Sequence, residues 1–279
     1  MSDTAANQVL HQQIIARGGI ADRTLQISGI SWFLVAALGQ WVFVYYLLAH
    51  YPPIFAKKGM PGLADTSMPG GYVPGDLAGN LAITAHVLIA IIIIGGGPLQ
   101  LIPAIRNRFR AFHRWMGRTY VTFSVLTSTA GLYLVWTRGV PGGMVGHLAI
   151  SLDAVLIYLF AGIAVYFAVT RQIDRHRRWA MRLFMVVSAV WFFRIGIMFW
   201  FMTTGGVGID PETFEGPALK VLYFGQMFIP LAILQLYFNA QDSDRAALKI
   251  MAAITVFAAT TVTAVGTFAA TMGMWLPRL

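Results

Sequence analysis

Long apolar runs alternate along the chain with short polar segments rich in glycine and proline. Seven runs have the length of a membrane span: 29–48, 79–102, 119–136, 146–169, 183–202, 218–238 and 250–275. A helix needs roughly 20 apolar residues to cross the hydrocarbon core of a bilayer. The pattern predicts an all-α, polytopic membrane protein with seven transmembrane helices, in which residues 29–279 form a single integral membrane domain.

The composition indicates what surrounds these runs. Hydrophobic residues make up 57% of the chain and charged residues only 11%, whereas a soluble domain carries about a quarter charged residues. We therefore expect a lipid bilayer to cover most of the surface. The net charge of +9 does not indicate nucleic acid, because most of the basic residues lie between the runs. The sequence contains no cysteine, which excludes disulfides, thiolate metal sites and cysteine-ligated iron–sulfur clusters.

Basic residues gather between the second and third runs and between the fourth and fifth. They are Arg106, Arg108, Arg110, Arg114 and Arg118 in the first loop and Arg171, Arg175, Arg177, Arg178 and Arg182 in the second. The positive-inside rule places both loops in the cytoplasm, with the N-terminal segment 1–28 on the same side and the C-terminus outside, in a bacterial inner membrane. The segment 51–78, rich in glycine and proline, is then expected to form an irregular outer loop. Trp275, near the end of the last run, is typical of an interface anchor.

Three familiar classes of membrane protein do not fit. The run 250–275 contains no lysine that could form the Schiff base of a rhodopsin. A cytoplasmic N-terminus is opposite to that of the usual seven-helix receptor. Asp153 is the only carboxylate within the runs, whereas ion-coupled transporters generally use several.

Two pairs of similar sequence words indicate an internal repeat. Gly-Asn-Leu-Ala-Ile-Thr at 79–84 and Gly-His-Leu-Ala-Ile-Ser at 146–151 open the second and fourth runs. His-Arg-Trp-Met-Gly-Arg at 113–118 and His-Arg-Arg-Trp-Ala-Met-Arg at 176–182 precede the third and fifth. The words predict that helices two to five, residues 79–203, are a duplicated hairpin that forms a four-helix bundle, although apolar words also recur in membrane helices by chance.

Each helix of this predicted bundle carries one histidine. His86 and His147 lie toward the outer face, and His113 and His176 lie at the inner mouth. Two imidazoles from facing helices are the axial ligands of a six-coordinate haem b, so two pairs could bind one haem near each face and pass electrons across the bilayer. Arginines near the inner pair could hold haem propionates through bidentate contacts: Arg114, Arg118, Arg178 and Arg182.

The segment 105–121, with Arg-Asn-Arg-Phe-Arg-Ala-Phe-His-Arg-Trp-Met-Gly-Arg-Thr-Tyr, and the segment 176–182 resemble the bacterial membrane family known as domain of unknown function 2306. This resemblance covers about helices two to six and implies a fold and a topology but no activity. The histidine layout is also similar to the cytochrome b561 family, whose members pass electrons between two haems b. That similarity implies that His86 pairs with His147 and His113 with His176. A chain of this kind, if enzymatic, is a transmembrane oxidoreductase.

Asp153 and Arg194 leave other interpretations open. The repeat aligns Asp153 with His86, so these two residues could form a polar clamp, or bind a divalent metal together with His147. Arg194, in the middle of the fifth run, needs either a salt bridge to Asp153 or an anionic ligand or quinone carbonyl. The leading hypothesis is a haem-b electron-transfer protein that uses a quinone. The alternatives are a non-redox protein that binds a metal ion, lipid or anion, and an assembly partner of a respiratory complex.

Overall fold

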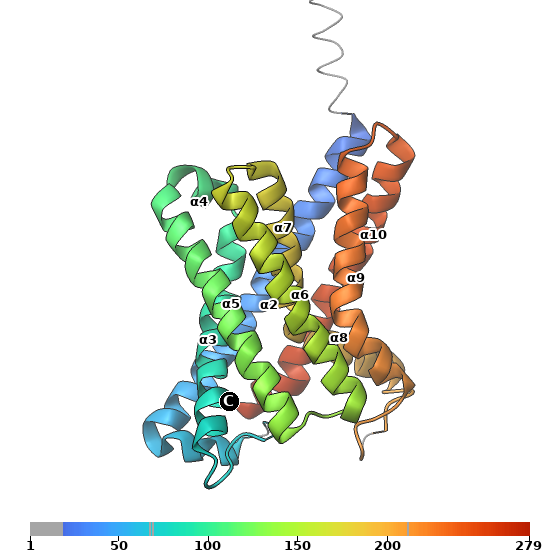
Figure 1. Ribbon diagram of the computed structural model, residues 1–279. Helices are drawn as coiled ribbons and strands as arrows, with labels where there is room; N and C mark the ends of the chain where they lie inside the picture. Colours follow the sequence, from blue (N-terminus) through green and yellow to red (C-terminus); the bar gives the residue numbers. More distant parts are fainter. Residues whose placement is uncertain (1–18, 67, 69, 211) are drawn as a thin grey trace, which may run out of the picture.

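The structure is a computed structural model of the chain and describes residues 19–66, 68, 70–210 and 212–279. Within these ranges its regular structure is helical, and an isolated bridge between Asp210 and Glu215 is the one β-type pairing. The long helices are α2 (Ile20–Lys58), α3 (Leu77–Leu101), α5 (Arg110–Arg138), α6 (Gly143–Val169), α7 (Ile173–Val187), α8 (Ala189–Thr204), α9 (Pro217–Gln241) and α10 (Ala246–Ala270) (Figure 1). Short helices are η1 (Met60–Asp65), α4 (Pro103–Arg108), η2 (Thr271–Trp275) and η3 (Leu276–Arg278). The predicted all-α fold is confirmed.

Five helices are long and apolar enough to cross a bilayer: α2, α3, α6, α9 and α10 with its C-terminal turns. The bent pair α7 and α8 makes a sixth span if the two helices are counted as one. Helix α5 does not reach this criterion, because arginines occupy its first turns and hydroxyl residues lower the hydropathy of the remainder. These are Thr119, Thr122, Ser124, Thr127, Ser128 and Thr129. Length and composition thus support five or six spans, fewer than the seven predicted.

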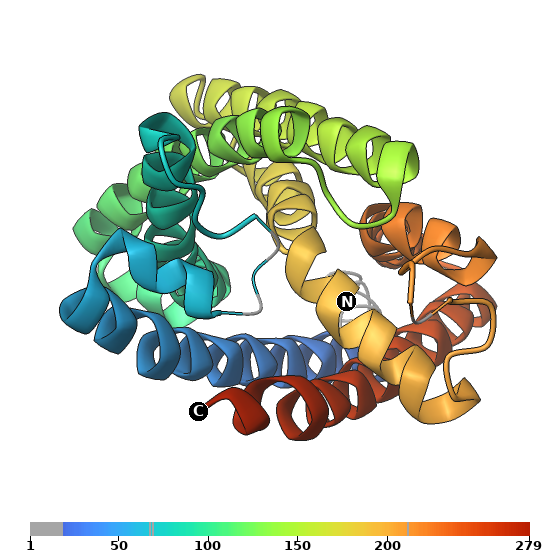
Figure 2. The same ribbon diagram turned by 90° about the horizontal axis from the view of Figure 1, so that it is seen from below.

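The long helices stand side by side in one bundle (Figure 1). Helices α2 and α10 run parallel in extensive contact, and an ion pair between Asp22 and Lys249 joins them near their starts. Helix α3 packs against α5, and α6 packs against α7, as two antiparallel hairpins. Helix α8 then crosses from this part of the bundle toward α10 (Figure 2). The two hairpins coincide with the two segments that carry the repeated sequence words.

The second hairpin is broken where the first is continuous. Helices α7 and α8 meet at Ser188 with a bend of 52°, whereas α5 runs without interruption from Arg110 to Arg138. The buried Ser188 hydroxyl accepts a hydrogen bond of 2.9 Å from the side chain of Gln40 on α2. A side chain that bonds at a break is a common cause of a helix kink. The bend gives α7 and α8 different directions, so that α7 packs on α6 while α8 reaches α10.

Helix α2 is longer than its apolar run at both ends. It begins at Ile20, so part of the expected N-terminal segment is helical; residues 1–18 of that segment lie outside the described residues. It also continues through Pro52 and Pro53 to Lys58, where the sequence predicted an irregular loop. A proline so close to a C-terminus removes one intrahelical bond, and the burial of Tyr51 and Leu63 in the adjoining apolar cluster offsets that loss.

The rest of the expected outer loop is tied down by Arg138 at the end of α5. Its guanidinium donates hydrogen bonds of 2.8 and 3.0 Å to Asp76, 2.6 Å to the Gly70 carbonyl and 2.7 Å to the Asn80 amide oxygen. The Asn80 side chain also bonds both backbone groups of Val73. The Gly79-Asn80 word therefore fixes this loop to the start of α3.

Candidate functional site

His86 faces α5 and not α6. Its Nδ1 lies 3.2 Å from the Thr127 carbonyl oxygen on α5. The imidazole also packs beside Gly131, one turn further along α5, where a Cβ atom would lie 3.5 Å from His86 Cε1, an ordinary van der Waals distance. The described hydrogen bonds of His86 do not include Asp153, and the polar clamp considered from the sequence is not the arrangement in this structure.

His147 lies at the start of α6, against the end of α5. Its Nδ1 is 2.7 Å from the Gly143 carbonyl oxygen, and its ring meets the Trp136 indole edge-on at 5.3 Å. Trp136 in turn donates a hydrogen bond of 3.0 Å to Ser151 of α6. Gly131 and Trp136 are five positions apart on α5, or about 7.5 Å along its axis. Both outer histidines therefore contact the same helix, but at different depths.

The inner histidines lie close to each other at the opposite end of the bundle. His176 Nδ1 is 2.9 Å from the Ala164 carbonyl oxygen of α6. His113 lies within electrostatic range of both His176 and Arg106. The Nδ1 atom of His113 is buried and has no hydrogen-bond partner among the described residues. The structure thus brings together the two histidines that the sequence placed at the inner mouth.

Three of these four imidazoles share one hydrogen-bond pattern. A backbone carbonyl can only accept a hydrogen bond, so the Nδ1 atoms of His86, His147 and His176 must carry the proton. The Nε2 atom of a neutral imidazole in that tautomer keeps its lone pair. Histidines that bind metals are usually held in this way, with the other ring nitrogen bonded to a carbonyl or carboxylate.

The arginines expected to surround the inner pair mostly face other groups. Arg178 donates a hydrogen bond of 2.7 Å to Asp242, whose pKa it holds below the usual range, and Arg182 bonds Gln235 at 2.7 Å. Both partners belong to the α9 region. Arg118 lies 5.1 Å from the centre of the Trp115 ring. Arg114 is exposed.

Arg106 lies near His113, and Arg177 lies near Arg106. Partial burial lowers the pKa of Arg106, and the nearby positive charge of Arg177 lowers it further. Arg106 in turn acts electrostatically on His113. From the sequence both arginines were expected only as charges of the cytoplasmic loops, with no role at the histidines.

Asp153 and Arg194 do not form the salt bridge considered from the sequence. Asp153 is buried on α6, and its Oδ1 has no partner in the described part of the chain. Arg194 donates to the Val190 carbonyl of its own helix at 3.1 Å and lies 5.5 Å from the centre of the Phe43 ring on α2. The described residues also contain no group of three or more histidine and carboxylate side chains placed to hold a metal ion.

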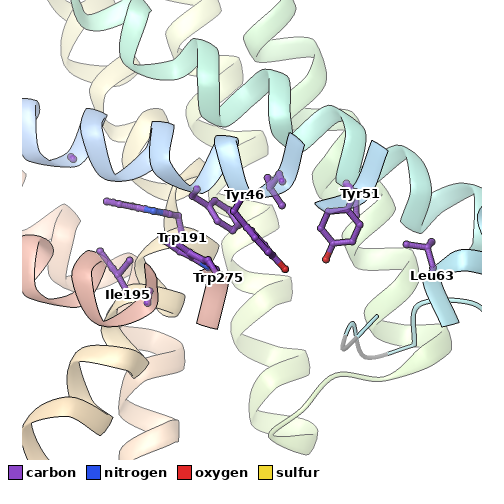
Figure 3. Packing of buried hydrophobic residues seen from close by; sticks show 11 residues of the cluster. Tyr46, Tyr51, Leu63, Trp191, Ile195 and Trp275 are labelled. Carbon is purple, nitrogen blue, oxygen red and sulfur yellow. The ribbon is translucent and has the colours of Figure 1, made fainter. Parts of the chain in front are cut away.

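The sequence analysis missed an aromatic cluster beside Arg194. Trp275 was expected at the membrane interface, but only 1% of its surface is exposed. It packs with Phe43 and Tyr46 of α2, at ring distances of 4.9 and 6.4 Å, and Trp191 of α8 lies in the same cluster (Figure 3). Aromatic residues at the end of an apolar run are typical of an interface, and the run alone does not show that another helix covers them.

Together these features define a multi-pass helical membrane protein with histidines and isolated polar groups among its helices. Residues 83–238, more than half of the chain, match the family described as "Predicted membrane protein (DUF2306)", and the chain belongs to that family. No curated protein and no solved structure matches the chain. The similarity to the cytochrome b561 layout stays a prediction.

Proposed function

We propose that this chain is a membrane-embedded haem-b electron-transfer protein, with His113 and His176 as one pair of axial ligands and His86 and His147 as the other. The observation that carries the proposal is the inner pair. His113 and His176 come from different helices and lie within electrostatic range of each other. The Ala164 carbonyl holds His176 in the tautomer whose Nε2 is free to bind a metal.

The residues present suit haem b, which would supply one-electron transfer at its iron. Two neutral imidazoles are a suitable axial set, and the buried Nδ1 of His113 lacks a protein partner. Arg106 and Arg177 are placed to compensate propionates at the inner mouth. Arg178 and Arg182 orient α7 against α9 instead. The outer pair fits less directly, because its two histidines contact α5 at different depths.

The visible spectrum tests this proposal. Protein purified from haem-supplied cells should show a Soret band that shifts on reduction with dithionite, and the ratio of haem to chain should be about two. His176→Ala should remove one haem. His50→Ala is the matched control, because His50 Nδ1 also meets a carbonyl, that of Arg278 at 2.9 Å, but the residue belongs to neither pair. A haem-free spectrum, or an unchanged ratio in His176→Ala, would overturn the proposal.

The proposal includes seven crossings of a bacterial inner membrane, with α5 and the α7–α8 pair each crossing once and the N-terminus in the cytoplasm. Helix α5 has 29 residues, a length of roughly 43 Å, and basic residues gather at one end of the bundle. The chain has no natural cysteine, so single cysteines can be labelled without background. In intact cells an impermeant maleimide should label Thr137→Cys and not Arg110→Cys. Labelling of both from outside would refute the crossing by α5.

We also propose a membrane quinone as the electron partner, reached directly or within a respiratory complex. A one-electron site close to each face suits transfer to a carrier that dissolves in the bilayer. Reduced protein should be reoxidised by a short-chain quinone within seconds, and His176→Ala should slow this reaction. Equal rates in the two proteins would exclude the inner pair from the path.

A further inference from the structure

Arg194 lies among the membrane-spanning helices with no carboxylate to compensate its charge. Its guanidinium is bonded to the Val190 carbonyl at 3.1 Å and faces the Phe43 ring. The ion pairs of the described ranges do not include Arg194. Arg194 interacts electrostatically with Tyr46, Tyr51, Arg278 and His86, and none of these is a carboxylate. A cation inside a bilayer is costly unless an anion or strong acceptors surround it.

Two buried indole N–H groups in the aromatic cluster beside Arg194 lack a hydrogen-bond partner among the residues that the structure describes. The indole N–H groups of Trp191 and Trp275 are buried and have no acceptor in the described part of the protein. Both tryptophans are 1% exposed, so water does not readily accept a hydrogen bond from either indole. Arg194 has five N–H groups, of which one bonds a described acceptor. Buried donors without acceptors are rare in proteins, and such a cluster calls for an acceptor from outside the chain.

Two tyrosine hydroxyls are further hydrogen-bond donors in this cluster. Tyr46 and Tyr51 are buried, with ring centres 6.3 Å apart, and both act on Arg194. Their hydroxyl groups point away from α2 on one side (Figure 3). A hydroxyl can donate to an anion, and an aromatic wall can pack against an apolar chain.

The cluster adjoins η3. His50 stacks on Tyr46 at 5.3 Å, and its Nδ1 donates to the Arg278 carbonyl at 2.9 Å, which ties η3 to the last turns of α2. The Arg278 side chain is exposed and acts on both Arg194 and Tyr51. Arg194 and the exposed Arg278 therefore both act on Tyr51.

We propose that Arg194, Tyr46, Tyr51 and Arg278 form a binding site for the anionic head of a membrane amphiphile, a fatty-acid carboxylate or a phospholipid phosphate. The uncompensated charge favours an anion over a neutral carbonyl, because only an anion balances the guanidinium in an apolar interior. An apolar chain is needed as the carrier, since a free inorganic anion enters hydrocarbon poorly. The site does not depend on haem.

Native mass spectrometry of the full chain tests this site. Protein from haem-depleted cells, which cannot offer a propionate, is placed in phosphatidylcholine nanodiscs with oleate, phosphatidylglycerol or inorganic phosphate added separately. We expect one oleate or one phosphatidylglycerol bound per chain and no phosphate. Arg194→Gln should weaken binding at least about tenfold, as expected for the loss of a hydrogen-bonded charge. Arg114→Gln, at an exposed arginine, should leave it unchanged.

Two further variants keep the test decisive if Arg194→Gln folds poorly. The Arg194→Lys variant retains the charge and should bind the lipid more weakly than the parent. The double variant Arg194→Lys, Tyr51→Phe should bind the lipid more weakly still. Oleate binding alone identifies a carboxylate ligand, and phosphatidylglycerol binding alone a phosphate ligand. Equal binding of inorganic phosphate would replace the lipid with a soluble anion and overturn the proposal. Binding that does not respond to the Arg194 or Tyr51 variants overturns it as well.

Discussion

Replacement of Arg138 by methionine should destabilise the protein more than the loss of an exposed charged side chain such as Lys58. The Arg138 side chain is 6% exposed and its guanidinium holds Asp76, the Gly70 carbonyl and Asn80. Methionine keeps most of the volume, so the change isolates the polar contacts. Without them, segment 66–76 loses its attachment to α5.

The magnitude follows from these contacts. A hydrogen bond from a charged group contributes about 1.5–3 kcal/mol, and Arg138 makes bonds to four residues: Gly70, Gly71, Asp76 and Asn80. The partners lie near the surface and regain water when Arg138 is lost, so we expect a net cost of about 3 kcal/mol. For a chain of this size that cost lowers the apparent Tm by about 5–10 °C. Lys58→Met is the control, because Lys58 and Asp65 are 62% and 58% exposed and an exposed pair contributes about 0–1 kcal/mol.

Thermal unfolding in one detergent at constant pH measures both variants, and limited proteolysis reports whether segment 66–76 has loosened. The Gly79 backbone N–H and Arg138 lower the pKa of Asp76. A group with a lowered pKa stabilises the fold above its unfolded pKa, here about 3.8, and loses that effect as the pH falls through its folded value. The difference between parent and Arg138→Met should therefore shrink below about pH 4. Equal Tm changes in Arg138→Met and Lys58→Met would refute the reasoning.

Two packing predictions concern α10 and the α7–α8 bend. Gly266→Ala should lower the stability by about 1–3 kcal/mol, because its Cβ would lie 2.5 Å from the Ile195 carbonyl oxygen. Gly162→Ala is the control and should be neutral, because its Cβ would meet nothing within 4 Å. Equal Tm values for the two variants would contradict this prediction. Ser188→Ala should cost about 1–3 kcal/mol, since it leaves the buried Gln40 amide N–H unpaired. Gln40→Leu should cost less, because it also removes a buried carbonyl oxygen that has no partner; the reverse order of Tm values would argue against the bond.

The apolar runs predicted the helices well and their ends poorly. Each run falls on one long helix, except that the run 183–202 is divided between α7 and α8. The runs locate the helices because the hydrophobicity of a span is a property of the sequence itself. The end of α2 was wrong because Pro52 and Pro53 usually mark a boundary, and the compensating burial of Tyr51 and Leu63 depends on elements distant in the sequence. The bend at Ser188 likewise depends on Gln40, which is on another helix.

The inner site shows that helical spacing carries more information than nearness in the chain. Arg178 and Arg182 are four positions apart and share one face of α7, which packs on α9. His176 precedes Arg178 by two positions, a rotation of about 200°, and therefore points to α6 instead. Arg177, only one position away from His176, lies nearer its side. Arg178 and Arg182 were predicted as propionate ligands because they are close to His176 in the sequence. The angle around the helix axis is the better guide to which side chains share a face.

The same periodicity explains why Arg194 does not reach Asp153. Trp191 and Ile195 belong to the cluster that α8 shares with α2, whereas Phe193 and Ile197 belong to the cluster on the side of α6 and α9. Arg194 is three positions after Trp191 and next to Ile195, so helical geometry assigns it to the α2 stripe, where its guanidinium faces Phe43. An ion pair with Asp153 on α6 would require α8 to rotate and to expose Trp191. Because the buried indole opposes that rotation, the charge of Arg194 must be balanced on the α2 side of the bundle.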